Sequence, residues 1–462
     1  MYIIINDNMV SFLDILRKIY LEEEYGKNII GSGSYGDVYE YEEYAIKIIS
    51  IEKYSDKEVY NYIKAFKANK IQDLKTRENN KFSIFNIQKL SNIVNIHFAV
   101  NPENSQSIFL KNIELNIDVE EILLIYDLCK NFNISVIVMD CNTSILSEKF
   151  IRQFENIDTY QCNKCNHNMV PTLFAKRIKC SFCDNVYTRY KMSSTEVNML
   201  EIMKELVNLL IVQYPFVENP HCDIRLPNIL SDDLNKLKLC DLSISYGGKL
   251  EFTNDDLLCS CKFKRVLCNA INYTSPGLLV FKKDKENIIQ DIRDNELFAS
   301  ILTIFTFINY CCQKNKFNNN IYNTVFSNLC HNGHLDSHIT FLTKLYGLYN
   351  NYDNPQGLKL YDIIAQQDYS YENTLTIYQI FRKIDENKAD ILSYHKNNES
   401  PYIDQVYSVL LEQDYFPEAN IIFILLQALK TFSDNPISKS DLIHKCLPFL
   451  VEEEHSPVKS TD

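Results

Sequence analysis

Four cysteines in the middle of the sequence have the spacing of a metal site. Cys162 and Cys165 form one C-x₂-C pair, Cys180 and Cys183 form a second, and fourteen residues separate the pairs. Each pair can form a knuckle with the spacer as a hairpin, and four thiolates complete the tetrahedral coordination of Zn²⁺. Four ligands leave no open position, so the pattern predicts a structural zinc. Rubredoxin-like iron or a chance cluster are the alternatives, and His167 is a spare ligand.

A second set of polar residues suits magnesium and phosphate chemistry. Asp223 is followed after five residues by Asn228, and after thirteen more by Asp241, which ends a short apolar strand at 237–239. Oxygen ligands of this kind suit Mg²⁺ or Mn²⁺ on the phosphates of a nucleotide, and a loop aspartate can act as a base. The D-x-x-x-x-N spacing is common by itself. Its meaning depends on a phosphate-binding segment elsewhere in the chain.

A glycine-rich loop upstream has the features of a phosphate-binding segment. The sequence G-S-G-S-Y-G at 31–36 lies between apolar strands at 29–30 and 38–39, and Lys47 lies on the next strand, 44–49. Small residues let backbone amides approach phosphate oxygens, and the lysine adds a positive charge. A loop that joins two strands disfavours a dinucleotide-binding fold, where the third glycine opens a helix. A glycine-rich hairpin with a surface lysine is the plainer interpretation.

The loop, A-I-K at 45–47, and the set Asp223, Asn228 and Asp241 together resemble the motifs of the eukaryotic-type protein kinases. The resemblance implies an α+β, bilobal fold with a small β-rich N-lobe, a large helical C-lobe and a zinc-ribbon-like insertion after the hinge. It implies these segments: an N-terminal helical extension at 1–23, the N-lobe and hinge at 24–142, the four-cysteine insertion at 158–192, the C-lobe at 143–157 and 193–450, and a disordered tail at 451–462.

The same resemblance assigns ATP-binding roles. Lys47 would contact the α- and β-phosphates, with Glu58 as its partner and Glu78 as the rival. Met139 would be the gatekeeper, and the backbone at 140–142 would bind adenine. The full implied set is Gly31, Ser32, Gly33, Ser34, Tyr35, Gly36, Val38, Ala45, Lys47, Glu58, Met139, Asp140 and Cys141.

Catalytic roles follow in the same way. Asp223 would accept or orient the proton of the substrate hydroxyl, and Asn228 and Asp241 would hold Mg²⁺. Arg225 stands where serine/threonine kinases have a lysine, and His221 would be a buried structural residue. The resemblance thus implies transfer of the γ-phosphoryl group of ATP to a Ser/Thr hydroxyl of a protein. The alternatives are a pseudokinase scaffold that uses the zinc insertion, or a small-molecule kinase of the same fold.

Several positions depart from the family pattern. Cys222 replaces an arginine that receives an activation-loop phosphate, and Asp241-Leu242-Ser243 replaces D-F-G. Gly277 and Ser438 stand where the family has a paired glutamate and arginine. Both members of that pair are absent together, which leaves no buried charge unpaired. The metal ligands are kept, and regulation by the usual phosphate is in doubt.

Periodicity predicts the elements that carry these residues. The expected helices lie at 10–24, 56–74, 119–129, 194–210, 297–312 and 438–450, and further strands lie at 92–96 and 135–141. The uncharged stretch 297–312 is sixteen residues long, which is shorter than a usual membrane span, so it predicts a buried core helix. Asp294, just before it, would brace the catalytic loop on the resemblance.

Composition limits the function classes. The 462 residues are 46% hydrophobic with a net charge of −13, typical of a globular chain. That charge argues against binding to bulk nucleic acid or to an anionic membrane. Basic residues around the four cysteines leave a docking partner or a nucleic-acid surface open there. Fifteen cysteines without an N-terminal signal predict reduced thiols in an intracellular protein, cytoplasmic or nuclear.

Overall fold

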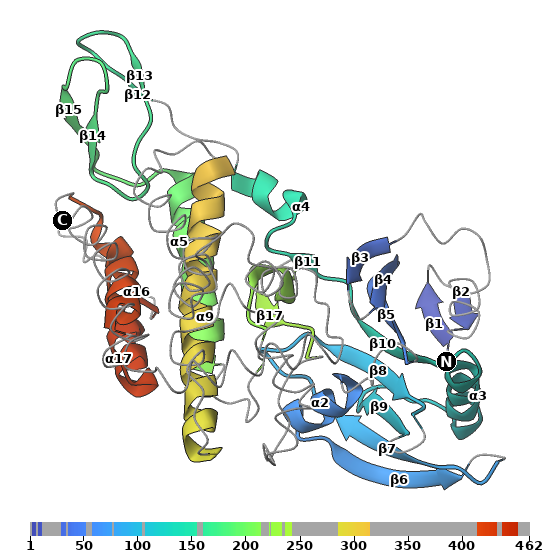
Figure 1. The fold of residues 1–462 in the computed structure, drawn as a ribbon. Coiled ribbons are helices and arrows are strands. Elements are labelled where there is room, and N and C mark those ends of the chain that lie inside the picture. Colours follow the sequence, from blue (N-terminus) through green and yellow to red (C-terminus); the bar gives the residue numbers. More distant parts are fainter. Residues whose placement is uncertain are drawn as a thin grey trace, which may run out of the picture. The chain divides into compact units, whose positions relative to one another are not determined.

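The chain is a mixed α+β protein that forms two compact units (Figure 1). The first comprises Met1–Thr143, Val217–His221 and Asn228–Gly248, and the second comprises Ser144–Phe216, Cys222–Pro227 and Lys249–Asp462. This computed structural model describes residues 2–5, 8–11, 29–33, 36–51, 58–75, 78–103, 107–154, 160–213, 221, 223–232, 236–242, 285–314, 414–431 and 437–450.

An eight-stranded sheet is the centre of the first unit. In spatial order its strands are β3 (Ile29–Gly33), β4 (Gly36–Tyr41), β5 (Tyr44–Ser50), β10 (Ile134–Asp140), β8 (Ile96–Asn101), β9 (Ile108–Asn112), β7 (Lys81–Ile87) and β6 (Asn69–Lys75). Neighbours are antiparallel except β7 and β9, which are parallel. A separate hairpin joins β1 (Tyr2–Ile5) to β2 (Asn8–Ser11).

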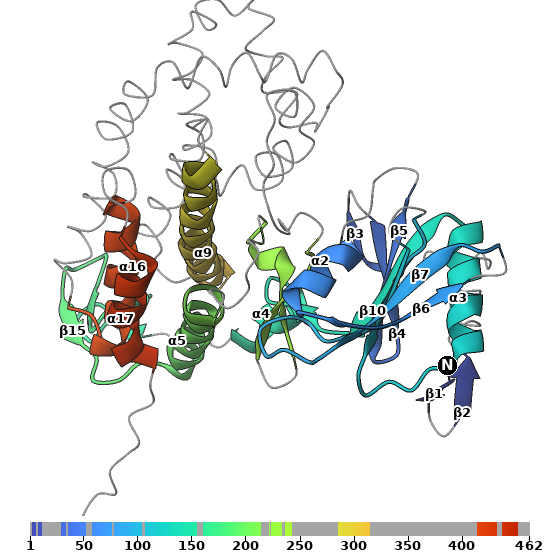
Figure 2. The same ribbon diagram turned by 90° about the horizontal axis from the view of Figure 1, so that it is seen from below.

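Two helices cover opposite faces of this sheet (Figure 2). Helix α3 (Val119–Asn131) packs in a core with Ile46 and Ile48, whereas α2 (Glu58–Ala65) packs in a core with Ala45 and Ile49. Because successive side chains of a strand point to opposite faces, Lys47 lies on the α2 side, between Ala45 and Ile49. The alternation along β5 therefore decides which helix can supply the partner of the lysine.

Short strands complete the first unit. Strands β16 (Ile229–Ser231) and β17 (Leu237–Leu239) form a hairpin, and η5 (Leu226–Asn228) precedes it. The hairpin joins the segment before β8, where Val94 N donates to Leu239 O at 2.8 Å and Leu239 N donates to Asn92 O at 3.0 Å. These bonds fix the chain that leads into Asp241. The predicted strand 237–239 is confirmed.

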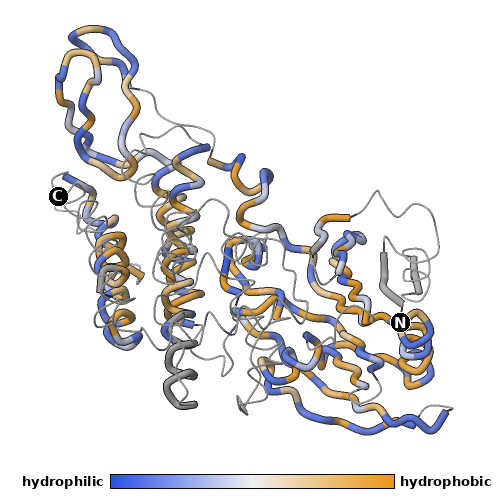
Figure 3. The backbone as a smooth tube through the Cα atoms, viewed as in Figure 1, coloured by the Kyte–Doolittle hydropathy of each residue, from blue (hydrophilic) through white to orange (hydrophobic). Residues whose placement is uncertain are grey.

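Helices dominate the second unit. They are α4 (Glu148–Ile151), η2 (Arg152–Phe154), α5 (Ser194–Val207), the π-helical η3 (Asn208–Gln213), α9 (Lys285–Lys314), η8 (Pro417–Ala419), α16 (Asn420–Thr431) and α17 (Lys439–Leu450). The short strand β11 (Thr143–Ser144) lies where the chain enters this unit. In Figure 3 much of α9 and of α16 is coloured hydrophobic, as expected of packed helices.

Helix α9 contains a long apolar stretch. Its stretch Glu296–Lys314 is long and apolar enough to cross a membrane by length and composition, but 83% of that window is buried inside the structure. Core helices of globular proteins pass the same test. The predicted helix 297–312 is therefore present with the burial expected of a core helix.

The structure corrects three predicted elements. The helix expected at 56–74 ends at Ala65, because Ala68 N donates back to Ile63 O at 2.8 Å and Lys67 has a φ of 47°, after which the chain becomes strand β6. The strand expected at 92–96 begins only at Ile96, and the residues before it make a single bridge to Leu239. In the helix expected at 10–24, the first two residues belong to β2.

Other predictions agree with the structure, and some fall outside the described residues. The helices at 119–129 and 438–450 are present as α3 and α17, and strand 135–141 is present as β10. Those outside are the rest of the 10–24 helix, Ser34, Tyr35, Cys222, Gly277 and the tail at 451–462.

Candidate active site and candidate metal centre

Lys47 lies at the centre of a buried cluster of charges in the first unit. Its Nζ donates to Glu58 Oε2 at 2.6 Å and to Asp241 Oδ1 at 3.0 Å, and the residue is only 7% exposed. Glu58 opens α2 and also accepts from the Tyr62 hydroxyl at 3.3 Å. Burial opposes the charge on the lysine, but the two carboxylates outweigh it and hold the pKa of Lys47 above its ordinary value.

The sequence left two glutamates, Glu58 and Glu78, as possible partners of Lys47, and the structure places Glu58 beside the lysine. Glu58 is buried and lies on the first turn of α2, on the same sheet face as the lysine. Glu78 instead forms an exposed ion pair with Lys130. Lys47 contacts Glu58 because side chains alternate along β5 and that of Lys47 points toward α2.

The β16–β17 hairpin positions Asp241. Cys240 N donates to Asn228 O at 3.0 Å, so the two expected magnesium ligands, Asn228 and Asp241, lie on neighbouring segments. His221 Nε2 lies 2.9 Å from Cys240 O and is buried, in keeping with a structural role. Asp241 has a φ of 60°, a conformation that aspartate tolerates better than most residues.

Helix α2 also fixes the residue that follows Asp241. Asn61 Nδ2 donates to Leu242 O at 2.6 Å, and Leu242 is buried in the core that includes α2. The chain after β17 is therefore held at Asn61 as well as at Lys47. The charged cluster depends on three segments: β5, α2 and the end of the β16–β17 hairpin.

The glycine-rich segment contributes the paired ends of β3 and β4. Gly33 pairs with Gly36, and Ser32 Oγ donates to Asp37 Oδ1 at 2.7 Å. A Cβ added to Gly36 would lie 2.2 Å from the carbonyl oxygen of Ile48, so only glycine fits there. Gly31 has no such contact and sits in more open space.

Side chains expected to line an adenine site lie on this sheet. Ala45 and Met139 are buried, and Val38 packs partly buried against the same core. The backbone amides of Asp140 and Cys141 already donate, to Asn95 O at 3.1 Å and to Glu43 O at 2.9 Å. These two amides are therefore already hydrogen-bonded within the protein. Of the amides at 140–142 expected to bind adenine, the one at residue 142 is the remaining candidate donor.

A second polar cluster lies at the end of β10. The Asp140 carboxylate lies 2.7 Å from His97 Nε2 and accepts from Asn95 Nδ2 at 3.2 Å. Burial raises its pKa, but these contacts outweigh burial and leave the pKa of Asp140 below its ordinary value. Sequence reasoning missed this cluster, because Asp140 lies more than forty residues from Asn95 and His97 and no local pattern links them.

Asp223 and Arg225 lie in the second unit and contact each other. Asp223 is buried, and its Oδ2 lies 3.2 Å from Arg225 Nε. The Thr303 hydroxyl on α9 shares its proton between Ala299 O of the same helix, at 2.8 Å, and Ile224 O of this loop, at 3.3 Å. Sequence reasoning assigned the bracing of this loop to Asp294 and missed Thr303. A threonine inside a strongly apolar helix was the available signal.

The four cysteines of the second unit form a compact cluster. Their Sγ atoms all lie within 4.8 Å of one another, with Cys162 and Cys183 3.5 Å apart and Cys165 and Cys180 3.6 Å apart. Tetrahedral zinc with Zn–S bonds of about 2.3 Å places its sulfurs roughly 3.8 Å apart, close to these separations. The cluster is therefore consistent with a zinc-binding module, and the donor set suits structural Zn²⁺.

Two equivalent turns build this cluster. Cys162 N donates to His167 O and Asn166 N donates to Cys162 O, in the first turn. In the second turn Cys180 N donates to Asn185 O and Asp184 N donates to Cys180 O. Residues 166 and 184 both have a positive φ, which asparagine and aspartate tolerate.

Each turn belongs to its own hairpin. Strands β12 (Tyr160–Gln161) and β13 (Asn168–Met169) flank the first cysteine pair, and β14 (Arg177–Lys179) and β15 (Val186–Thr188) flank the second. The spacer between the cysteine pairs is therefore not one hairpin, as the spacing suggested. It joins two hairpins whose turns carry the thiols.

Tyr187 on β15 supports the cluster from outside the four thiols. Its hydroxyl lies 3.3 Å from Cys162 Sγ and accepts from Asn163 N at 2.8 Å and Asn185 Nδ2 at 2.9 Å. The hydrogen bond from Tyr187 lowers the pKa of Cys162 to about 6 against the opposing effect of burial. Within the same cluster the pKa values of Cys165 and Cys183 are raised instead, so the tyrosine favours the metal-binding thiolate form at Cys162.

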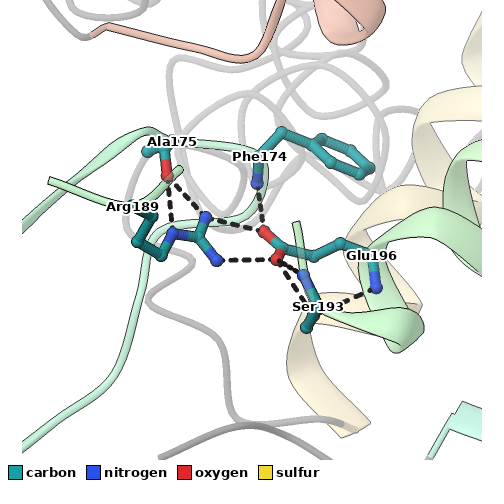
Figure 4. Close-up of polar contacts among 5 residues, drawn as sticks. All are labelled: Phe174, Ala175, Arg189, Ser193 and Glu196. Carbon is teal, nitrogen blue, oxygen red and sulfur yellow. Dashed lines mark hydrogen bonds and ion pairs between the residues drawn. The ribbon is translucent and has the colours of Figure 1, made fainter. Parts of the chain in front are cut away.

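A buried ion pair joins this module to α5 (Figure 4). The Arg189 guanidinium donates to both Glu196 oxygens, at 2.7 and 2.9 Å, and to Ala175 O. Glu196 also accepts from Phe174 N at 2.7 Å and from Ser193 N at 2.9 Å, and Ser193 caps α5. Burial opposes ionisation, but these bonds outweigh it and hold the pKa of Glu196 below its ordinary value.

The geometry thus yields two candidate sites, one in each unit: the Lys47 cluster and the four-cysteine module. The thiol cluster fits a zinc ion by its donors and spacing, whereas the lysine cluster offers carboxylate oxygens beside a buried cation. In comparisons with known proteins, no family model and no curated protein matches this chain.

Proposed function

We propose that this chain is a divergent protein kinase of the eukaryotic type, with a bilobal fold, that transfers the γ-phosphoryl group of ATP to a Ser or Thr hydroxyl of a protein. The observation that carries the proposal is the Lys47 cluster. A buried lysine on the strand after a glycine turn touches a helix glutamate, Glu58, and the aspartate that ends a later hairpin, Asp241. Phosphoryl transfer requires this combination of a fixed cation and metal-binding carboxylates.

Each residue then has a defined task. Lys47, held by Glu58, would contact the α- and β-phosphates, and the glycine turn would bring backbone amides to the phosphate oxygens. Asn228 and Asp241 would hold Mg²⁺, which supplies charge neutralisation on the phosphates when bound. Asp223 would accept or orient the proton of the attacking hydroxyl, and Arg225 would contact the phosphoryl group.

The second candidate function is a catalytically inactive scaffold of the same fold. The ion pair between Asp223 and Arg225, 3.2 Å long, favours it. A carboxylate that already neutralises an arginine is a weaker base, and the charge it would offer to a hydroxyl is reduced. The scaffold would retain the Lys47 cluster as a structural ion pair.

Phosphotransfer by the purified chain separates the two functions. Wild-type protein with Mg²⁺ and γ-labelled ATP should label a protein substrate or itself on Ser or Thr, and Lys47→Met and Asp223→Asn should each abolish the label. Lys81→Met is the matched control, because Lys81 is an exposed lysine of the same sheet. Wild-type protein that neither binds ATP nor transfers phosphate while remaining folded would show the scaffold to be correct.

We also propose that the four cysteines hold one structural Zn²⁺. Four thiolates close the coordination shell, and the module's own core is small, consisting of Cys162, Met169, Ile178 and Cys180 with partly buried neighbours. A core of that size cannot fold a module alone, so the metal supplies the stability. Metal analysis of the purified chain should find about one zinc per chain, and iron in its place would overturn this assignment.

A further inference from the structure

The four-cysteine module is a basic island in an acidic chain. Its segment 158–192 contains six Lys and Arg residues and two Asp residues, which gives it a charge of +4. The rest of the chain carries −17, so the whole chain has a net charge of −13. Four thiolates with one Zn²⁺ add two negative charges, and Glu196 outside the segment neutralises Arg189, which leaves the loaded module at about +1. Charge alone therefore directs an anionic partner to this module and away from the remainder of the surface.

The module also presents the exposed aromatic rings. Among the described residues, Phe182 and Tyr190 are the only Phe or Tyr side chains that are exposed, at 76% and 93%. Phe182 lies between the cysteines of the second turn, and its ring stacks on that of His167 from the first turn, with 6.0 Å between centroids and 20° between planes. A large apolar ring left in water at the tip of a turn points to a binding role.

The β14–β15 hairpin carries both the positive charge and an exposed aromatic ring, Phe182, in its turn. Arg177 and Lys179 alternate with Ile178, so both cations point away from the metal core that Ile178 enters. On β15 the exposed residues are Val186 and Thr188, which pair with Lys179 and Arg177.

The cations of this face remain available to a ligand. Lys179 pairs with Asp184 at 2.8 Å and Arg177 lies 3.8 Å from Asp414, yet both basic side chains are about two thirds exposed. Ion pairs at that exposure contribute little, so an incoming anion can replace the carboxylates. The hairpin thus carries two exposed cations on one face, an aromatic pair at the turn that joins its strands, and Tyr190 just beyond β15.

We propose that this face binds single-stranded nucleic acid. Unstacked bases have flat π-faces that stack on exposed rings such as Phe182 and Tyr190, whatever their sequence, and the phosphates between them suit Arg177 and Lys179. Duplex DNA buries its bases in the stack and would meet only a charge of about +1, too little for tight binding by charge alone. The small charge also implies that few counterions are released on binding.

Fluorescence anisotropy with a labelled 15-nucleotide oligo(dT) tests this proposal on the full, zinc-loaded chain. We expect binding that weakens about tenfold in Phe182→Ala and several-fold in Lys179→Ala, with little competition from a duplex of equal length. Zinc content and far-UV circular dichroism should match wild type in both variants. Lys81→Ala, which removes an exposed lysine of the first unit, is the matched control and should bind as wild type does.

Three outcomes would overturn the proposal. One is the absence of binding by the zinc-loaded wild type at 50 mM salt. Another is equal competition by duplex or by poly-glutamate with no effect of Phe182→Ala, which would make the face a surface for acidic proteins. The third is self-association that Phe182→Ala removes while oligonucleotide binding is absent, which would make a second copy of the chain the occupant.

Discussion

Two ion pairs among the described residues have both side chains buried, and they differ in how their partners are bonded. The Arg189–Glu196 pair is 3% and 0% exposed, and its partners are further bonded to the backbone of Phe174, Ala175 and Ser193. In the Lys47 cluster the lysine divides its donors between buried Glu58 and Asp241, whose side chain is 26% exposed.

The difference separates a structural pair from one suited to ligand exchange. A buried pair whose remaining hydrogen bonds go to backbone has one arrangement, and it holds the module to α5. A lysine shared with a partly exposed carboxylate can exchange that carboxylate for another anion, such as a phosphate. Burial alone therefore does not distinguish the two pairs; the exposure of their partners does.

The largest effect should follow from removing the metal donors. Cys162→Ser with Cys165→Ser should release the zinc and unfold both hairpins of the module, because structural zinc contributes about 10–16 kcal/mol of apparent binding free energy. Limited proteolysis should cut within 160–192 while the sheet of the first unit stays protected. Simultaneous loss of the sheet would show that the two regions do not fold independently.

Next in size is the loss of the structural pair. Glu196→Ala leaves the Arg189 charge buried without its carboxylate and should cost about 3–5 kcal/mol in urea unfolding. The double variant Arg189→Met with Glu196→Leu should recover most of that loss, because no unpaired charge remains. A cost below about 1 kcal/mol for the single variant would contradict the assignment of this pair as structural.

The wild-type pair also predicts a pH dependence. Because the folded-state pKa of Glu196 is lowered, its ion pair stabilises the fold above the unfolded value near 4.3 and is lost as pH falls through the lower folded value. Unfolding measured between pH 3 and 6 should show this loss in the wild type. It should be absent from the double variant.

At the Lys47 cluster we expect a smaller change of stability with pH, and of opposite sign to that of the Glu196 pair. Lys47→Met leaves Glu58 buried without the lysine, which favours its protonated form. A carboxyl whose pKa is raised in the folded state loses stability as pH rises, so the variant should be less stable at pH 8 than at pH 5.5, by about 1.4 kcal/mol for each unit by which the folded pKa exceeds about 5.5. Adding Glu58→Gln should remove the pH dependence.

The smallest effect is expected at Glu78, the exposed glutamate that does not contact Lys47. Glu78→Gln breaks only the surface pair with Lys130, in which Glu78 is 70% exposed, and should change stability by about 0–1 kcal/mol. Phosphotransfer, if present, should also be unchanged, whereas Glu58→Gln should reduce it strongly. Equal effects of the two substitutions would break the distinction between the buried and exposed glutamates.

Local pattern predicted much of the fold. Strands β3 to β5, helix α3, the core helix α9 and the C-x₂-C turns all follow from contiguous residues. The helix predicted at 56–74 was wrong after Ala65, because pairing with β7 turns the polar stretch Asn69–Lys75 into an edge strand. Periodicity cannot detect a partner strand supplied by another part of the chain.

The residues able to do chemistry could be read from the chain alone: four thiols at zinc spacing, a glycine turn, a strand lysine and a set of oxygen ligands. Their spacing reflects local turns, which neighbouring residues encode. Three contacts required the folded structure: Lys47 meets Glu58 and not Glu78, Thr303 holds the Asp223 loop, and Arg189 and Glu196 anchor the zinc module. Those contacts join residues from separate elements, and packing of the sheet and helices brings them together.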